Sequence, residues 1–205
     1  MTEVDIPKNP LSFLRTIFKT SRAVILAGRG LQEPTRRALV RDLQRVCANC
    51  RSAYERFLKQ LAPLKASYSQ PAALVKEVQR LASQPEYRQT FKPDKLCGDI
   101  DDLLTRLHSN LDPLKYSVGV TRIGKLREQL KAFQNYDLAF YQTFDSFAVE
   151  VSRLATRLEA AITEGEDRSR IRALRDQIRR KVEKLEADVS ATLSEVLATH
   201  TQVQV

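Results

Sequence analysis

The chain of 205 residues is 42% hydrophobic and 29% charged, which excludes a disordered chain and allows a sizeable core. Its best uncharged apolar run, residues 23–28, is far shorter than the roughly 18 residues of a membrane-spanning helix, so we do not expect the chain to span a membrane by itself. The formal net charge of +9 is concentrated in residues 1–92, with 17 Lys and Arg against 7 Asp and Glu, and it favours nucleic acid, anionic lipid or an acidic protein face without choosing among them.

Two helices are predicted in the first third of the chain. The first begins at Asn9 and Pro10, an N-cap followed by proline at the first helical position, and a pair of glycines ends it. The second has Pro34 in its first turn and runs to about Pro63, with its apolar residues in one narrow arc. Its basic residues lie on the opposite side of the helix: Arg37, Arg41, Arg45, Arg51, Arg56 and Lys59.

Two shorter helices are predicted next. Ser69 and Pro71 begin a helix that carries four apolar residues at helical spacing. Residues 84–93 contain two prolines and are expected to form a loop. A leucine-rich helix is expected over residues 94–112, and Pro113 and Gly119 bracket the link that follows it.

The apolar residues between Thr121 and Glu164 alternate spacings of three and four, which predicts one long helix. Only Asp137 interrupts this ladder, so it is expected either to set the register of a paired helix or to mark a bend. Six aromatic residues gather around it. We expect most of them to be core, and the alternative is a helix-docking surface formed by Phe133, Tyr136, Asp137, Phe140, Phe144 and Phe147.

A tight turn at Gly165 is expected to fold a last helix, over residues 166–199, back along the long helix. The predicted fold class is therefore all-α: a helical bundle with a long antiparallel C-terminal helical hairpin. Residues 1–120 would supply the N-terminal helices of the bundle and residues 121–200 the hairpin that packs on them, as one continuous domain. Residues 201–205 are expected to be a frayed tail.

No catalytic constellation is evident, and the chain is not expected to be an enzyme. Cys47 and Cys50 form a CxxC, but the further ligands of a zinc site and the strand of a thioredoxin site are missing nearby, so both are read as buried structural thiols. The two histidines, His108 and His200, begin no metal-binding motif. Phosphate-binding glycine loops and a nucleophile elbow are also absent. We expect no metal, no cofactor and no small-molecule substrate.

The strongest functional signals are two basic segments, the arginine face of the second helix and the run from Arg168 to Lys184. The alternative to a binding surface is a solvated basic face. The residues expected to bind an anionic partner or lipid are Arg37, Arg41, Arg45, Arg56 and Lys59. Nucleic acid is the less favoured partner, because the aromatic residues fall on the apolar ladders and not between the basic residues, where they could stack on bases.

Two segments resemble the helical bundles of cell-death proteins, the HeLo and necroptosis-executor type. They are LVRDLQRVCANCRSAYERFLKQL and DIDDLLTRLHSNLDPLKYSVGVTRIGKLREQLKAF. The resemblance is one of pattern, over about residues 36–160, and the polar first ten residues depart from it, since such domains usually begin with an apolar helix. It implies a bundle that oligomerises and acts on anionic membranes.

We therefore expect a non-catalytic helical interaction module whose basic face engages an acidic protein or an anionic surface. The alternatives are a membrane-acting effector of the cell-death type that binds anionic lipid and oligomerises, and a nucleic-acid-binding subunit. An odd number of cysteines, three, and a polar start predict a reducing, cytoplasmic location that includes the periphery of a membrane.

Overall fold

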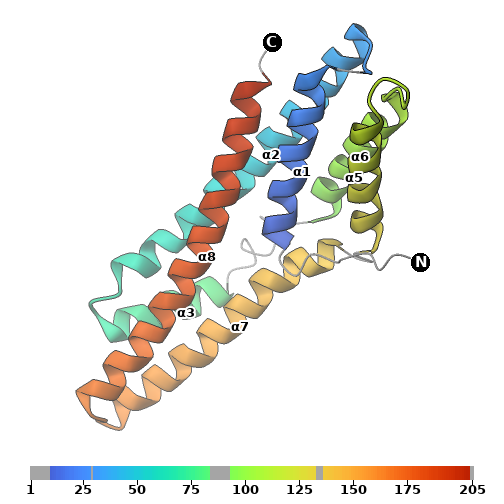
Figure 1. Cartoon of the computed structure of the whole chain (residues 1–205). Helices are drawn as coiled ribbons and strands as arrows, with labels where there is room; N and C mark the ends of the chain where they lie inside the picture. The colour runs from blue at the N-terminus through green and yellow to red at the C-terminus, as the bar shows by residue number, and fades with distance from the viewer. Residues whose placement is uncertain (1–9, 29, 84–92, 133–135, 204–205) are drawn as a thin grey trace. The chain divides into compact units, whose positions relative to one another are not determined.

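The computed structural model describes residues 10–28, 30–83, 93–132 and 136–203, and of residues 93–97, 132 and 136–143 it describes the backbone alone. These residues form seven helices and no strand, which confirms the all-α fold class (Figure 1). The helices are α1 (Pro10–Ala27), α2 (Glu33–Ala66), α3 (Pro71–Ser83), α5 (Pro93–Asn110), α6 (Ser117–Ala132), α7 (Tyr136–Thr163) and α8 (Arg168–Gln202).

The chain divides into two compact units. Unit 1 comprises residues 1–52, 92–140 and 191–205, and unit 2 comprises residues 53–91 and 141–190. The long helices α2 and α8 contribute residues to both units, and the first five residues of α7, 136–140, also belong to unit 1.

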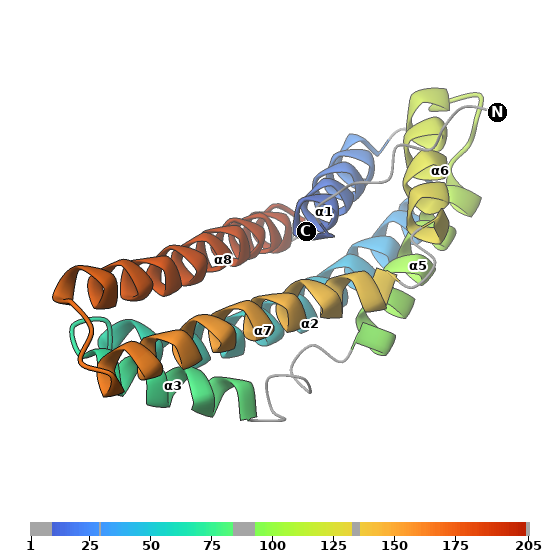
Figure 2. The same ribbon diagram turned by 90° about the horizontal axis from the view of Figure 1, so that it is seen from below.

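Unit 2 is a bundle of the C-terminal part of α2, α3, α7 and the N-terminal part of α8. Its core includes Phe57 and Phe144, whose rings meet edge to face with centroids 5.0 Å apart, an arrangement that aromatic pairs favour. At the surface the amide of Gln79 donates to Glu159 at 3.2 Å, which joins α3 to α7. Figure 2 shows α3 and α7 near each other in this part of the chain.

A four-residue turn joins α7 to α8. Gly165 has a φ of 68°, a left-handed conformation that glycine adopts without the steric cost of a Cβ. The backbone N–H of Glu166 donates to the carbonyl of Ala161 at 2.9 Å, and that of Gly165 donates to Ile162 at 3.3 Å. These are the two bonds of a Schellman motif, which ends α7 and turns the chain back as an antiparallel hairpin. The turn predicted at Gly165 is therefore present.

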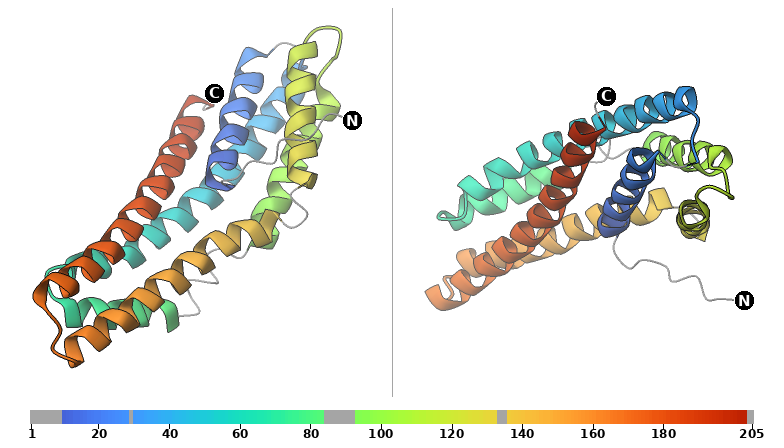
Figure 3. Two further views of the ribbon diagram at one scale, coloured as in Figure 1. Left: turned by 60° about the horizontal axis from the view of Figure 1, so that its bottom comes forward. Right: turned by 45° about the horizontal axis from the view of Figure 1, so that its top comes forward.

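Unit 1 contains α1, the N-terminal part of α2, α5, α6, residues 136–140 of α7 and the C-terminal part of α8. In both views of Figure 3, α1 lies between the end of α8 and α6. Arg22 of α1 forms an ion pair of 2.9 Å with Glu195 of α8. Arg106 of α5 lies 2.9 Å from Asp42 of α2. The apolar face of each helix packs inward, with Leu14, Ile17, Leu43, Leu104, Ile123 and Val196 fully buried.

One expectation is corrected, and another is only partly covered by the described residues. The long helix predicted over residues 121–164 is helical over residues 121–132 in α6, which begins at Ser117, and over residues 136–163 in α7. Residues 133–135, which decide whether the two are continuous, lie outside the described residues, so a single long helix stays a prediction. The frayed tail predicted over residues 201–205 does not include residues 201–203. α8 continues to Gln202, the side chain of Val203 is buried, and Gln44 donates to the Val203 carbonyl at 3.4 Å. Residues 204–205 lie outside the described part of the chain.

Candidate anion-binding surfaces

Three of the predicted anion-binding residues form a row on the part of α2 that belongs to unit 1. Arg37, Arg41 and Arg45 are spaced by four residues and are all exposed. On a helix this spacing places successive side chains about 6 Å apart on one face. The opposite face of the same segment is buried, with Leu39, Leu43, Val46, Cys47 and Cys50 in the core. The α2 row, as we call these three arginines, is exposed because the apolar face of the helix points inward.

The carboxylates nearest the α2 row do not remove its charge. Arg37 pairs with Glu33 at 3.0 Å, and both side chains are at least half exposed, at 69% and 50%. Such exposed pairs contribute only about 0–1 kcal/mol, so a partner's carboxylate can replace them. Arg45 lies 3.6 Å from Asp42, which also accepts a bond from Arg106 at 2.9 Å. Hydrogen bonds from Arg36 and then Arg37 lower the pKa of Glu33, so this carboxylate remains ionised.

The other two predicted residues, Arg56 and Lys59, lie on the part of α2 that belongs to unit 2. Both are exposed. They share the basic side of the helix, opposite the buried Tyr54, Phe57 and Leu61. They are therefore not part of the α2 row of unit 1.

The expected helix-docking surface is not formed by the two of its residues whose side chains are described. Phe144 and Phe147 are 1% and 7% exposed. The Phe144 ring packs on Phe57, so neither ring can meet a partner without opening the core. Phe133, Tyr136, Asp137 and Phe140 lie outside the described side chains.

The cysteines of the CxxC are buried in unit 1. Burial raises the pKa of the Cys47 thiol to about 12, and it raises the pKa of Cys50 well above its ordinary value. Both therefore stay protonated thiols at neutral pH, which makes them poor nucleophiles and poor metal ligands. The side chain of Cys97 lies outside the described residues.

The described residues offer neither a metal-binding cluster nor a membrane-spanning helix. In that part of the chain no three His, Cys, Asp or Glu side chains gather in a group that could hold a metal ion. None of its helices has both the length and the apolar character that a crossing of the bilayer requires.

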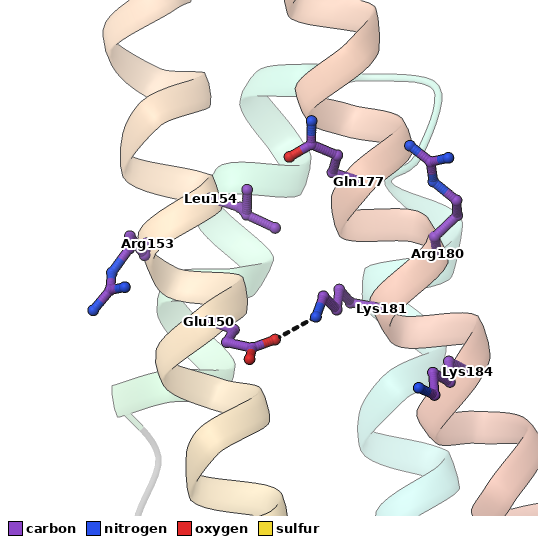
Figure 4. A pocket seen from close by; sticks show the side chains of 7 residues that line it. All are labelled: Glu150, Arg153, Leu154, Gln177, Arg180, Lys181 and Lys184. Carbon is purple, nitrogen blue, oxygen red and sulfur yellow. Dashed lines mark ion pairs between the residues drawn. The ribbon is translucent and has the colours of Figure 1, made fainter.

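Unit 2 carries a groove of about 490 Å³ between α7 and α8, which we call the hairpin groove. It is lined by Glu150, Arg153 and Leu154 of α7 and by Gln177, Arg180, Lys181 and Lys184 of α8 (Figure 4). Four of these residues are basic and one is acidic. The ammonium of Lys181 lies 2.6 Å from the carboxylate of Glu150, and both side chains are about half exposed, at 51% and 52%, so the groove is open to solvent.

The side chains of the hairpin groove point in three directions. In Figure 4, Glu150, Leu154, Gln177 and Lys181 extend into the space between the helices. Arg153 extends away from α8, and Arg180 extends away from α7. The guanidinium groups therefore stand at opposite edges of the groove, and Leu154, Gln177 and the Glu150–Lys181 ion pair lie between them.

Sequence reasoning found one wall of this groove and missed the other. The run from Arg168 to Lys184 was singled out by its charge, but Arg153 and Leu154 were not. The signal that could have found them is the turn at Gly165, because folding the chain about it brings Leu154 opposite Gln177. The apolar ladder of the long helix instead indicated Phe144 and Phe147 as surface candidates, and both are buried.

A second pocket of about 390 Å³ lies in unit 1, where the connection after α1 meets the connection after α5. The backbone N–H of Asp112 donates to the carbonyl of Gly30 at 3.0 Å and joins the two connections. The charged residues that line the pocket are one lysine, Lys115, and one aspartate, Asp112. With no excess of either charge, this pocket offers less for an anion than the hairpin groove does.

Comparisons with protein-family models, with curated proteins and with solved structures gave no match. The resemblance to cell-death bundles therefore stays a prediction.

Proposed function

We propose that this chain is a non-catalytic helical interaction module that binds an acidic protein through the α2 row. The observation that carries the proposal is the exposure of Arg37, Arg41 and Arg45 at four-residue spacing, opposite a buried apolar face. An acidic helix with carboxylates four residues apart presents them at the same interval of about 6 Å. Arginine suits this role because its planar guanidinium can bind a carboxylate through two parallel hydrogen bonds.

A protein partner is favoured over nucleic acid by the absence of a stacking surface. Among the residues whose side chains are described, no phenylalanine or tyrosine is exposed. Proteins that bind single strands combine a basic groove with exposed aromatic rings, on which successive bases stack. The α2 row offers the charge without the rings.

A protein partner is also favoured over a membrane that is penetrated by α2. Helices that insert into the headgroup region expose large apolar residues beside their cations. Between Arg37 and Arg45 the exposed residues are the three arginines and Ala38, while the large apolar residues Leu39, Val40 and Leu43 are buried. The free buried thiols of Cys47 and Cys50 further support the cytoplasmic location that the proposal assumes.

The proposal is tested with a fluorescent alanine-based helical peptide that carries glutamate at every fourth position. Arg37, Arg41 and Arg45 are changed together to glutamate, and binding is measured by fluorescence anisotropy at low salt. We expect the affinity to fall by at least about tenfold, or about 1.4 kcal/mol, because three attractive contacts become repulsive.

The control is a second triple substitution in unit 1, in which Arg122, Lys125 and Lys131 of α6 are changed to glutamate. These residues are also exposed and the net charge changes by the same amount. If both triple variants lose affinity equally, the binding reflects net charge alone and the α2 row is not a site. Flotation with anionic vesicles and gel retardation with DNA complete the test. If the α2 variant alone loses binding to the vesicles, the row is assigned to lipid. If it alone loses binding to DNA, the row is assigned to nucleic acid.

A further inference from the structure

We infer that the hairpin groove of unit 2 is a second binding site, which holds an amphipathic helix of another protein with an apolar stripe between two rows of carboxylates. The groove and the α2 row of unit 1 share no residue, so this inference does not rest on the function proposed above.

Charge complementarity gives the first reason. The residues that line the groove carry four positive charges against the single carboxylate of Glu150. The three cations on α8 belong to a larger basic segment, since residues 168–184 hold eight Lys and Arg against two acidic residues. The carboxylate of Glu150 is already paired with Lys181, and Arg180 donates from its Nε to the backbone carbonyl of Asp176 at 3.3 Å. Arg153, Lys184 and the terminal nitrogens of Arg180 are therefore available to an incoming acidic group. An acidic partner is therefore the one that this groove attracts.

The directions of the two arginine side chains give the second reason, because they do not converge as the donors around a compact anion do. A phosphate or sulfate ion is held by donors that converge on one point. The guanidinium groups of Arg153 and Arg180 instead point to opposite sides of the groove (Figure 4). Two separated rows of negative charge, such as those along the two edges of an amphipathic helix, would match this arrangement.

The floor of the groove gives the third reason. Leu154 lies between the charged edges and is partly exposed, so it can pack against an apolar side chain of a partner. No aromatic residue lines the groove. Bases would find no ring to stack on, whereas a leucine stripe would cover Leu154 and the apolar stems of the lysines.

The test uses the full chain with the α2 row changed to glutamate, so that the row contributes nothing. The probe is a labelled helical peptide with a leucine stripe flanked on both sides by glutamate, and its control replaces every leucine by alanine. Binding is measured by fluorescence anisotropy, and circular dichroism checks that each variant is folded. We expect the leucine peptide to bind at least about tenfold more tightly than the alanine peptide, since only the former can bury apolar surface against Leu154.

Two charge-matched variants locate the site. In one, Arg153 and Lys184 are changed to glutamate at the groove. In the other, Arg168 and Arg172 are changed to glutamate; both are exposed on α8 and lie outside the groove. We expect the first pair to weaken the leucine peptide by at least about tenfold and the second by less than about threefold.

Several outcomes would overturn the inference. These are no binding of the leucine peptide, equal binding of the two peptides, or equal weakening by the two variant pairs. Displacement of the peptide by a single-stranded oligonucleotide at equal charge would assign the groove to nucleic acid. A concentration-dependent dimer in light scattering that is lost in the Arg153 and Lys184 variant would assign it to a second copy of the chain. Because the α2 row is already removed, failure here leaves the function proposed for that row untouched.

Discussion

The two buried thiols of α2 make the stability of the protein sensitive to alkali. In the folded chain the Cys47 thiol has a pKa of about 12, and burial also raises that of Cys50. In the unfolded chain both thiols return to about 8.5, the value for an unperturbed cysteine. Below about pH 8.5 both states are protonated and the full stability is present. Above it the unfolded state loses its protons first, so the free energy of unfolding falls as pH rises toward the pKa of the folded state.

We predict that the fall in the free energy of unfolding at high pH is smaller in a variant that lacks the Cys47 thiol. Between pH 8 and pH 10.5, the free energy of unfolding of the unmodified protein should fall by about 2.5 kcal/mol more than that of the Cys47→Ala variant, at up to about 1.4 kcal/mol per pH unit for one group. Urea titrations at the two pH values measure the difference, and the lysine and tyrosine contributions cancel because both proteins share them. Parallel pH dependence in the two proteins would mean that Cys47 is ionised in the folded state.

At the scale of the elements, two glycines differ in backbone conformation. Gly165 lies in the turn between α7 and α8, and Gly98 lies within α5. Gly165 has a φ of 68° and an added Cβ would meet no atom within 4 Å, so only its backbone conformation resists a side chain. Gly98 lies inside α5, an added Cβ would also meet nothing within 4 Å, and its φ is not in the left-handed region. The same substitution should therefore have opposite effects at the two positions.

We predict that Gly165→Ala lowers the free energy of unfolding by about 1–2 kcal/mol, the cost of a left-handed conformation for alanine. Gly98→Ala should instead raise it by about 0.5–1 kcal/mol, because alanine loses less backbone entropy in a helix. Chemical denaturation of both variants checks the pair. Two changes of the same sign would show that the backbone conformation does not control the effect.

The elements also show which parts of the structure could be predicted from the sequence. Helix ends marked by local chemistry were found to within a few residues, as with Pro10, Pro71 and Gly165, because capping depends on neighbours in the chain. The α2 row was predicted for the same reason: the buried arc containing Leu39 and Leu43 leaves only one side for the arginines. These features need no knowledge of distant contacts.

The hairpin groove and the aromatic cluster could not be predicted in that way. Which side of α7 is exposed depends on how α2, α3 and α8 cover it, and the helical spacing of its residues fits several arrangements equally well. The sequence allows Phe144 to belong to a partner surface. Only the structure shows that Phe57, 87 positions earlier in the chain, packs against its ring. Leu154 fell on the same apolar ladder and is nevertheless half-buried at the groove.

At the scale of the whole molecule, the sharing of α2 and α8 by both units should make unfolding a single transition. Loss of unit 2 would strip residues 53–66 of α2 and residues 168–190 of α8 of their buried partners, and helices in proteins owe most of their stability to such packing. The parts of α2 and α8 that belong to unit 1 would then be less stable, because the helical residues that continue each of them would be unfolded.

We predict that two probes of unfolding will give the same urea midpoint. Circular dichroism follows all helices, whereas labelling of Cys47 and Cys50 in a Cys97→Ser variant follows unit 1, in which both thiols are buried. Coincident transitions are the signature of two-state unfolding. Thiols that become reactive at a lower urea concentration, or two steps in the dichroism, would show that the units unfold separately.

Leu154 also gives this protein a place for an optical reporter. The chain contains no tryptophan, so a single Leu154→Trp substitution would provide the one indole that can be excited selectively. The position is partly exposed on the floor of the hairpin groove and is not part of the closed core, so the larger ring need not displace packed neighbours. Its emission would shift to shorter wavelength when an apolar side chain covers it and would stay unchanged when only charge is neutralised at the edges. One fluorophore could thus report whether the middle of the groove, and not just its rim, is occupied.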